Sequence, residues 1–291
     1  MKSPFALSIA LVFGFFVNGF GQTFSLTPDS LYEVISKRKV YFEGFYSSYT
    51  DSVVTFILVD GQTKTIKLKN IWQISSASKK QIRKGRFWPE NQFSNRTLLL
   101  PSAYGLKRKQ IQYQNFALGM NQLSIGLSDH VAVNVGLFPG LLWASVKFSY
   151  PIVENRLAIG AGVLTAAFAQ MGSPTPLFYH ACLTIGSREN HLTVGYIGSN
   201  QGKSDVVYSR SIQVSGLMRI HRKAHGFFEF ARFNDHEKKT PIGVAGVRTG
   251  RKDKKVEFGL VYLPQSKLVL PWFGFAYSFS RVRPGTILFS K

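Results

Sequence analysis

The chain has 291 residues, one cysteine and a formal net charge of +21 at pH 7. A single cysteine, Cys182, excludes an intramolecular disulfide and a metal site built from several cysteines. No run of about 18 apolar residues follows residue 21, so the sequence excludes a protein that crosses a membrane with helices. The length accommodates one small domain and one β-barrel.

The first 21 residues have the organisation of a secretory signal peptide. Lys2 precedes an apolar run from Phe5 to Val17, and the small residues Gly19 and Gly21 follow. The run is too short to cross a bilayer, which needs about 20 apolar residues. We therefore expect residues 1–21 to direct export and to be removed.

Residues 22–76 predict a small β-module. Four short strand patterns follow one another, and Asp60-Gly61 between two of them is typical of a hairpin turn. Before them, the apolar spacing over residues 31–40 predicts a short helix. The strand pattern, with a glycine-centred first strand and a closing Ile-x-x-Ile at 71–74, resembles Sm-like or SH3-like barrels. The resemblance implies packing or the binding of a periplasmic protein. Because no RNA-binding motif accompanies it, we expect no nucleic-acid partner.

Residues 77–95 predict a polar, basic linker. One interpretation is a solvated connector. The other is an anchor at a membrane boundary, where basic side chains meet phosphate-bearing lipid headgroups and tryptophan lies between apolar and wet surroundings. The anchor candidates are Lys79, Lys80, Arg83, Lys84, Arg86 and Trp88.

Residues 96–291 predict a β-barrel. In 272–280, Phe273, Phe275, Tyr277 and Phe279 alternate with small residues, so this strand has one aromatic and one small, polar face. Comparable segments recur along the chain, with 97–104 as a possible first strand and 111–127 as the next. The predicted fold is all-β: an antiparallel transmembrane barrel of about twelve strands, preceded by the small module.

The polar faces of these strands hold the candidate lumen residues. His180 and His191 lie on one face of neighbouring strands, Lys147 lies between two serines, and Glu257 opposes an aromatic face. Because a charge facing lipid at mid-membrane costs about 2–4 kcal/mol, we assign these four residues to the lumen. Catalysis would need a serine and an acid positioned beside His180 or His191, and a metal would need a third ligand. The sequence offers neither, and we expect no enzyme activity and no cofactor.

A segment at the start of the predicted barrel has a familiar pattern. Residues 95–107 contain a strand-like run that ends in Pro-Ser-Ala, Tyr-Gln-Asn follows at 113–115, and a Gly-x-x-Asp turn lies at 126–129. The pattern resembles uncharacterised outer-membrane β-barrel proteins of Bacteroidetes-type bacteria. The chain departs from it at 107–109, where Lys-Arg-Lys replaces the usual glycine-bearing turn. The resemblance implies the fold and the location, and it carries no activity.

The sequence leaves three functions open. The first is an outer-membrane barrel with a structural, narrow-pore or binding role. The second is a soluble periplasmic barrel that binds an apolar ligand, because alternation alone does not say which face points outward. The third is a barrel enzyme that modifies lipids. The excess positive charge fits phosphate-bearing headgroups, an anion-selective lumen or simply solvated turns.

Overall fold

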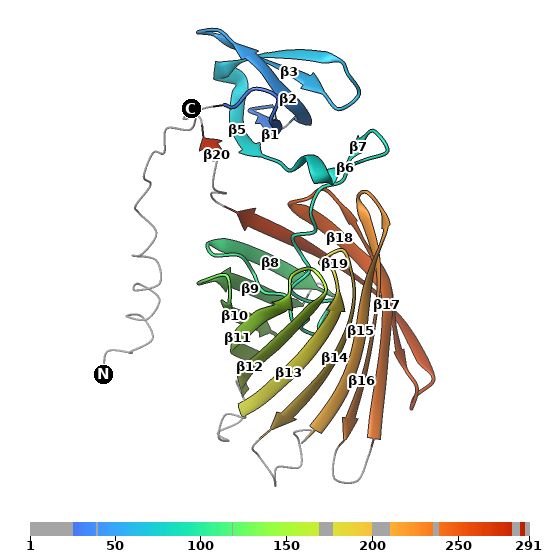
Figure 1. Ribbon diagram of the computed structural model, residues 1–291. Helices are drawn as coiled ribbons and strands as arrows, with labels where there is room; N and C mark the ends of the chain where they lie inside the picture. The colour runs from blue at the N-terminus through green and yellow to red at the C-terminus, as the bar shows by residue number, and fades with distance from the viewer. Residues whose placement is uncertain are drawn as a thin grey trace, which may run out of the picture. The chain divides into compact units, whose positions relative to one another are not determined.

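The computed structural model describes residues 26–38, 40–117, 119–168, 177–199, 210–234, 239–280 and 286–288. The predicted signal peptide lies outside these ranges. The described residues form two compact units, one up to residue 79 together with 286–288 and the other from 80 to 280 (Figure 1). Within the described ranges, no helix is both long and apolar enough to cross a membrane.

The first unit is an antiparallel sheet that contains six strands in the described part of the chain, in the order β20–β5–β1–β2–β3–β4. A 3-10 turn, Leu68–Asn70, leads from β4 into β5, and β5 returns to pair with β1. Phe42, Phe56 and Ile74 are among the buried residues of its core. The strands are β1 (Leu31–Ser36), β2 (Tyr41–Tyr49), β3 (Val53–Leu58), β4 (Thr63–Lys67), β5 (Ile71–Ser76) and β20 (Thr286–Leu288).

Two expectations for this unit are wrong. The helix predicted over 31–40 is a strand, because β1 pairs with β2 on one side and β5 on the other and thereby satisfies its backbone groups on both sides. The range 96–291 was expected to be barrel throughout, yet Thr286–Leu288 pairs with β5 of the first unit.

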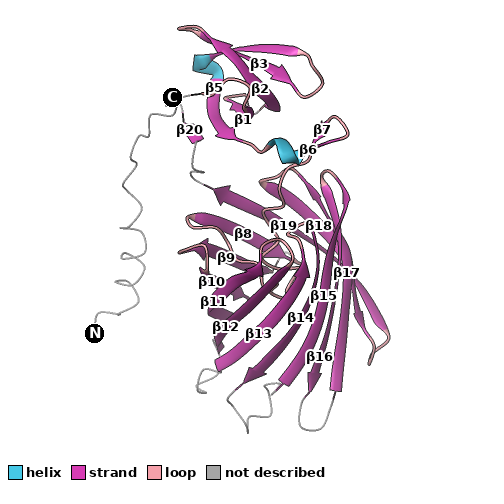
Figure 2. Ribbon diagram, in the orientation of Figure 1, coloured by secondary structure: helices cyan, strands magenta, loops and turns pink. Residues whose placement is uncertain are grey.

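The second unit is a closed antiparallel barrel in which the described residues supply twelve strands (Figure 2). Each strand pairs with its neighbours in sequence, and β19 closes the barrel against β8. The strands are β8 (Gln110–Phe116), β9 (Met120–Gly126), β10 (Val131–Phe138), β11 (Leu141–Val153), β12 (Leu157–Phe168), β13 (Leu177–Gly186), β14 (Asn190–Ser199), β15 (Arg210–His221), β16 (Ala224–Asn234), β17 (Lys239–Gly250), β18 (Lys254–Leu263) and β19 (Leu268–Ser280).

The outward face of the barrel is apolar and the inward face is largely polar. On β11, Val146, Phe148 and Tyr150 are exposed on the outside, whereas Lys147 and Ser149 are buried on the inside. Because strand side chains alternate, the same division recurs around the wall. This arrangement answers the question that alternation left open, namely which face points outward.

The two ends of the barrel differ in their connections. The start of β8, the end of β19 and the connections 127–130, 154–156, 187–189, 222–223 and 251–253 share one end, which we call the turn end. The ends of β8, β10, β12, β14, β16 and β18 and the starts of β9, β11, β13, β15, β17 and β19 share the other, which we call the loop end. The single strand expected over 111–127 is two strands, β8 and β9, because the chain turns at 117–119, where Ala117 has a positive φ of 49°.

Candidate functional site: a plug inside the barrel

Residues 89–106 lie inside the barrel and form what we call the plug (Figure 1). This position corrects two expectations: the second half of the basic linker 77–95 is not solvated, and 97–104 is not a strand of the wall. Instead the plug folds back on itself through a bridge between Arg96 and Pro101. Its buried residues are Asn91, Phe93, Ser94, Asn95, Arg96, Thr97, Leu98, Leu100, Ser102, Ala103, Tyr104, Gly105 and Leu106.

Glu229, in the middle of β16, holds the tip of the plug. Its carboxylate accepts hydrogen bonds from the backbone N–H groups of Leu98, of Leu99 at 3.2 Å and of Leu100 at 3.0 Å. A backbone turn with consecutive N–H groups aimed at one point is a natural anion-binding feature, and here the anion is a wall side chain. The hydroxyl of Thr97 adds a hydrogen bond to that of Ser215 on β15, at 3.0 Å.

A buried ion pair holds two carbonyl groups of the plug. Arg248 on β17 donates from Nε to Glu257 on β18 at 2.5 Å, and neither side chain is exposed. The same guanidinium donates to the carbonyl oxygens of Phe93, at 2.9 Å, and Thr97. A buried charge needs both a counter-charge and hydrogen bonds; the wall supplies the counter-charge through Glu257, and the plug supplies two further acceptors.

The opposite wall binds the returning half of the plug. Lys147 on β11 donates from Nζ to the carbonyl oxygens of Asn95, at 2.9 Å, and Tyr104, at 2.7 Å. The hydroxyl of Thr184 on β13 accepts the backbone N–H of Ala103 at 2.7 Å. Side chains from both sides of the barrel therefore satisfy the backbone of a segment with no regular secondary structure, as a buried loop requires.

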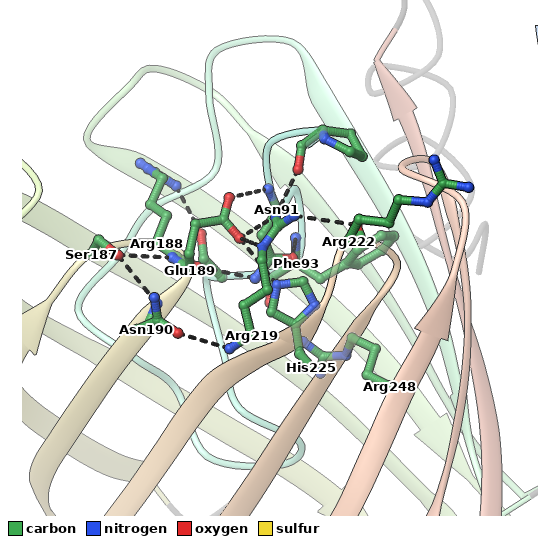
Figure 3. Close-up of polar contacts among 12 residues, drawn as sticks. Asn91, Phe93, Ser187, Arg188, Glu189, Asn190, Arg219, Arg222, His225 and Arg248 are labelled. Atoms are coloured by element: carbon green, nitrogen blue, oxygen red, sulfur yellow. Dashed lines mark hydrogen bonds and ion pairs between the residues drawn. The ribbon is translucent and has the colours of Figure 1, made fainter. Parts of the chain in front are cut away.

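Glu189, in the turn between β13 and β14, fastens the plug where it enters at the turn end (Figure 3). Its carboxylate accepts the backbone N–H of Asn91 at 2.8 Å and pairs with Arg219 of β15 and, at 3.0 Å, with His225 Nε2 of β16. Arg219 also donates to the carbonyl oxygen of Pro89 at 2.6 Å. We call Glu189, Arg219 and His225 the latch.

The electrostatics of the latch favour an ionised carboxylate. Burial acts to raise the pKa of Glu189, but the hydrogen bond with His225, the charge of Arg219 and the Asn91 N–H together hold this pKa below its ordinary value. In the same turn, the guanidinium of Arg188 donates to Ser94 and to the Gly105 carbonyl, at 3.1 Å each, and lies 5.0 Å from the Tyr104 ring. The turn thus touches the plug where it enters and where it leaves.

Of the four candidate lumen residues, Lys147 contacts the plug directly and Glu257 contacts it through Arg248. His191 is buried against the Tyr104 ring, and its Nδ1 lies 3.1 Å from the Ser187 carbonyl oxygen. His180 is half-buried, and its Nε2 has no partner among the described residues. The structure does not place either histidine within hydrogen-bond distance of a described serine hydroxyl, and no described group of three side chains could hold a metal ion.

The predicted basic anchor is on the surface. The five basic side chains are exposed, and Ile82–Arg83 (β6) and Arg86–Phe87 (β7) form a small hairpin that turns at Lys84 and Gly85, both with positive φ. Trp88 is half-buried, with the guanidinium groups of Arg83 and Arg219 at 5.9 and 5.7 Å from its ring. Trp88 therefore lies where the chain changes from surface hairpin to buried plug.

Glu189, Arg219, Glu229 and Arg248 were not predicted from the sequence to hold any segment inside the barrel. Glu229 and Arg248 could have been identified from the sequence, because each is a charged residue at an inward position of a predicted strand. Glu189 and Arg219 could not have been identified in this way, since charged residues at turns and strand ends are common. Only the position of the plug gives them a role.

Comparisons with known proteins give structural neighbours alone. No family model and no curated protein sequence matches the chain. Among solved structures it is similar to the KdgM porin, at 14% identity over 58% of this chain and 99% of that chain with a TM-score of 0.45. It is also similar to the NanC porin, at 9% identity over 60% and 99% with a TM-score of 0.43. A loop-deletion mutant of the outer-membrane protein OmpT of Vibrio cholerae matches at 12% identity over 86% and 97%, with a TM-score of 0.36.

Proposed function

We propose that the chain is an outer-membrane β-barrel whose lumen is closed by its own plug, so that its role is structural or ligand-binding rather than that of an open pore. The observation that carries this proposal is the set of wall side chains that satisfy the plug backbone: Glu229, Arg248, Lys147 and Thr184. A segment bonded from both sides of the barrel is part of the folded interior.

Several features support the membrane location. Large apolar side chains such as Phe228, Phe258 and Phe273 are exposed on the outward face, which favours lipid over water and disfavours a soluble carrier. The signal peptide predicted over 1–21 and the sequence resemblance to Bacteroidetes-type outer-membrane barrels support it as well. The exposed basic residues at 79–86 support contact with phosphate-bearing headgroups.

The first unit fits a partner-binding role. Its strand order, with β5 returning past a 3-10 turn to pair with β1, supports the Sm-like or SH3-like assignment. We propose that it faces the periplasm and binds a periplasmic protein. No residue of the site points to a reaction, so the proposal includes no catalytic step.

Two measurements test the proposal. Membrane fractionation with gel mobility of unboiled and boiled samples should show a membrane protein whose mobility shifts on boiling. Conductance of the purified protein in planar bilayers should be near zero, whereas a variant that lacks residues 92–104 should conduct. Steady conductance by the intact chain would contradict a closed lumen, and recovery in the soluble fraction would contradict the membrane location.

A further inference from the structure

The connections at the turn end differ in charge from one side of the barrel to the other. Between β9 and β14 the charges nearly balance, because Asp129, Glu154 and Glu189 offset Arg156 and Arg188. The β15–β16 and β17–β18 turns, the first residue of β18 and the segment that leads into β8 contain a single acidic residue, Asp253. Their exposed basic residues are Lys107, Arg108, Lys109, Lys223, Arg251 and Lys254. We call this side the basic sector.

The outward face of β19 carries a row of aromatic side chains in the basic sector. Phe273, Phe275, Tyr277 and Phe279 occupy successive outward positions, and we call them the aromatic ladder. The ring centres of Phe275 and Tyr277 are 5.8 Å apart, and those of Tyr277 and Phe279 are 6.2 Å apart. Successive outward residues are about 7 Å apart, so the ladder is about 20 Å long. Because one leaflet supplies about 15 Å of hydrocarbon, an acyl chain fits along it over its whole length.

A lysine of β18 lies over the aromatic ladder near its turn end. The strands β18 and β8 pair with β19 on its two sides (Figure 1). Lys254 is registered with Tyr277, and its exposed Nζ lies 5.2 Å from the centre of that ring. The carbonyl oxygen of Asp253 accepts the backbone N–H of Ser278 at 2.8 Å, so the β17–β18 turn lies against the end of β19. This contact keeps a cation at the upper limit of an apolar surface.

A second lysine adjoins the same end of β19 from the β8 side. Gln110, the first residue of β8, is registered with Ser280, so the exposed Lys109 comes next to the end of β19. Among the described residues, no carboxylate forms an ion pair with Lys109 or with Lys254. Phe279, which is 51% exposed, therefore lies between two cations that the described part of the chain does not neutralise.

We propose that the basic sector binds an anionic phospholipid from the surrounding membrane. One acyl chain lies along the aromatic ladder, and the phosphate lies at its turn end between Lys254 and Lys109. A zwitterionic phospholipid offers the same acyl chains, but its own cation opposes the attraction to the lysines, so the site selects a lipid with a net negative charge. The inference rests on the membrane location proposed above, to which it adds a defined site and a class of lipid.

Quenching of tryptophan fluorescence by brominated lipids tests the site in the full chain. Phe279→Trp places a reporter on the aromatic ladder, and Ile185→Trp places one on the balanced side of the barrel. Ile185 is the matched position, because it also lies on the outward face near the turn end and is 58% exposed. Each variant is reconstituted in vesicles of phosphatidylcholine and phosphatidylglycerol, with bromine on the acyl chains of one lipid at a time. The quenching of the four natural tryptophans, measured on the unsubstituted chain, is subtracted.

The two reporters should see different lipids. At Phe279→Trp, phosphatidylglycerol should bind at least fivefold more strongly than phosphatidylcholine, since each basic residue near an anionic lipid surface contributes about a fivefold factor. At Ile185→Trp the two lipids should bind equally. Lys254→Gln should lower the preference at Phe279→Trp about fivefold, whereas Lys254→Arg should retain it. Lys267→Gln removes an exposed lysine at the loop end and should leave the preference unchanged.

Each outcome decides the question. Equal preference at the two positions, or an unchanged preference in Lys254→Gln, would overturn the lipid site. Displacement of the lipid by soluble glycerol phosphate would overturn it as well, because a free phosphate would then suffice. If Phe279→Trp lost the boiling-dependent gel shift, Phe275→Trp on the same ladder would carry the measurement. Failure of the natural chain to float with phosphatidylcholine vesicles would refute the membrane location, whereas flotation without selective quenching refutes the anionic lipid alone.

Discussion

At the scale of single residues, Glu229 is the side chain on which the plug depends most directly. Glu229→Ala leaves the N–H groups of Leu98, Leu99 and Leu100 without their acceptor. Unsatisfied buried donors cost about 1–3 kcal/mol each, and partial relaxation of the tip reduces the sum, so we expect a loss of about 3 kcal/mol in the free energy of unfolding. Urea titration followed by the boiling-dependent gel shift measures it.

Two further variants make that result specific. Glu229→Gln keeps one acceptor oxygen but brings an amide N–H toward the same three donors, so its loss should be smaller than that of alanine. Glu154→Ala removes a carboxylate from an exposed turn and should change stability by less than about 0.5 kcal/mol. If Glu229→Ala were as stable as Glu154→Ala, the tip would not be held by this carboxylate.

Because of Glu189 in the latch, we also expect the free energy of unfolding to depend on pH. The pKa of Glu189 is held below its ordinary value in the folded chain, so the ionised carboxylate stabilises the fold above the unfolded pKa. This contribution is lost as pH falls through the lowered folded pKa. The free energy of unfolding should therefore decrease as the solution is acidified from the ordinary range of a carboxyl pKa to below it.

The Glu189→Gln variant tests whether Glu189, rather than another carboxyl group, causes the loss of stability in acid. The variant should be less stable than the natural chain at pH 7, because Arg219 loses its counter-charge and His225 loses a charged hydrogen-bond acceptor, and it should respond less steeply to acid. Urea titrations at a series of pH values measure both differences. The same slope in the two proteins would mean that other groups cause the acid sensitivity.

At the scale of elements, close contacts between strands restrict side-chain size. A Cβ atom added at Gly136 on β10 would overlap the indole ring of Trp143 on β11. Gly136→Ala must push this inward ring aside, and overpacking of this kind costs about 1–3 kcal/mol. Gly226→Ala on β16 is the matched control, because its nearest neighbour would lie at 3.7 Å. Thermal unfolding of the two variants should differ accordingly, and equal midpoints would contradict the packing.

The wall of the barrel was predictable from the sequence and the plug was not. Alternation in segments such as 272–280 depends only on which face points out of the barrel and which points in, so a short stretch of sequence is enough to show it. The run Thr97-Leu98-Leu99-Leu100 has the same local character, and so it resembled a strand. The run is bound instead by Glu229 and Arg248, which lie more than 100 residues away in sequence. A local sequence pattern gives no information about such distant contacts. The same limit applies to 31–40, where pairing with β2 and β5 overrides helical spacing.

At the scale of the whole molecule, the last described strand belongs to the first unit. Thr286–Leu288 pairs with β5, although more than 200 residues separate them in sequence. The sheet of the first unit is thus completed only after the barrel strands have been synthesised. Its stability should depend on the far end of the chain, whereas that of the barrel, closed by β19 against β8, should not.

A chain that ends after Ser280 tests this division. Removal of β20 takes the three register pairs from β5, and at about 0.2–1 kcal/mol for each cross-strand pair the first unit should lose about 1–2 kcal/mol. Limited proteolysis should then cleave residues 26–79 faster than in the full chain, because a weaker sheet opens more often. The boiling-dependent gel shift should remain, since the closing pair β19–β8 is intact. Unchanged protease resistance would show that the sheet is complete without β20, and a lost gel shift would show that the two units do not fold independently.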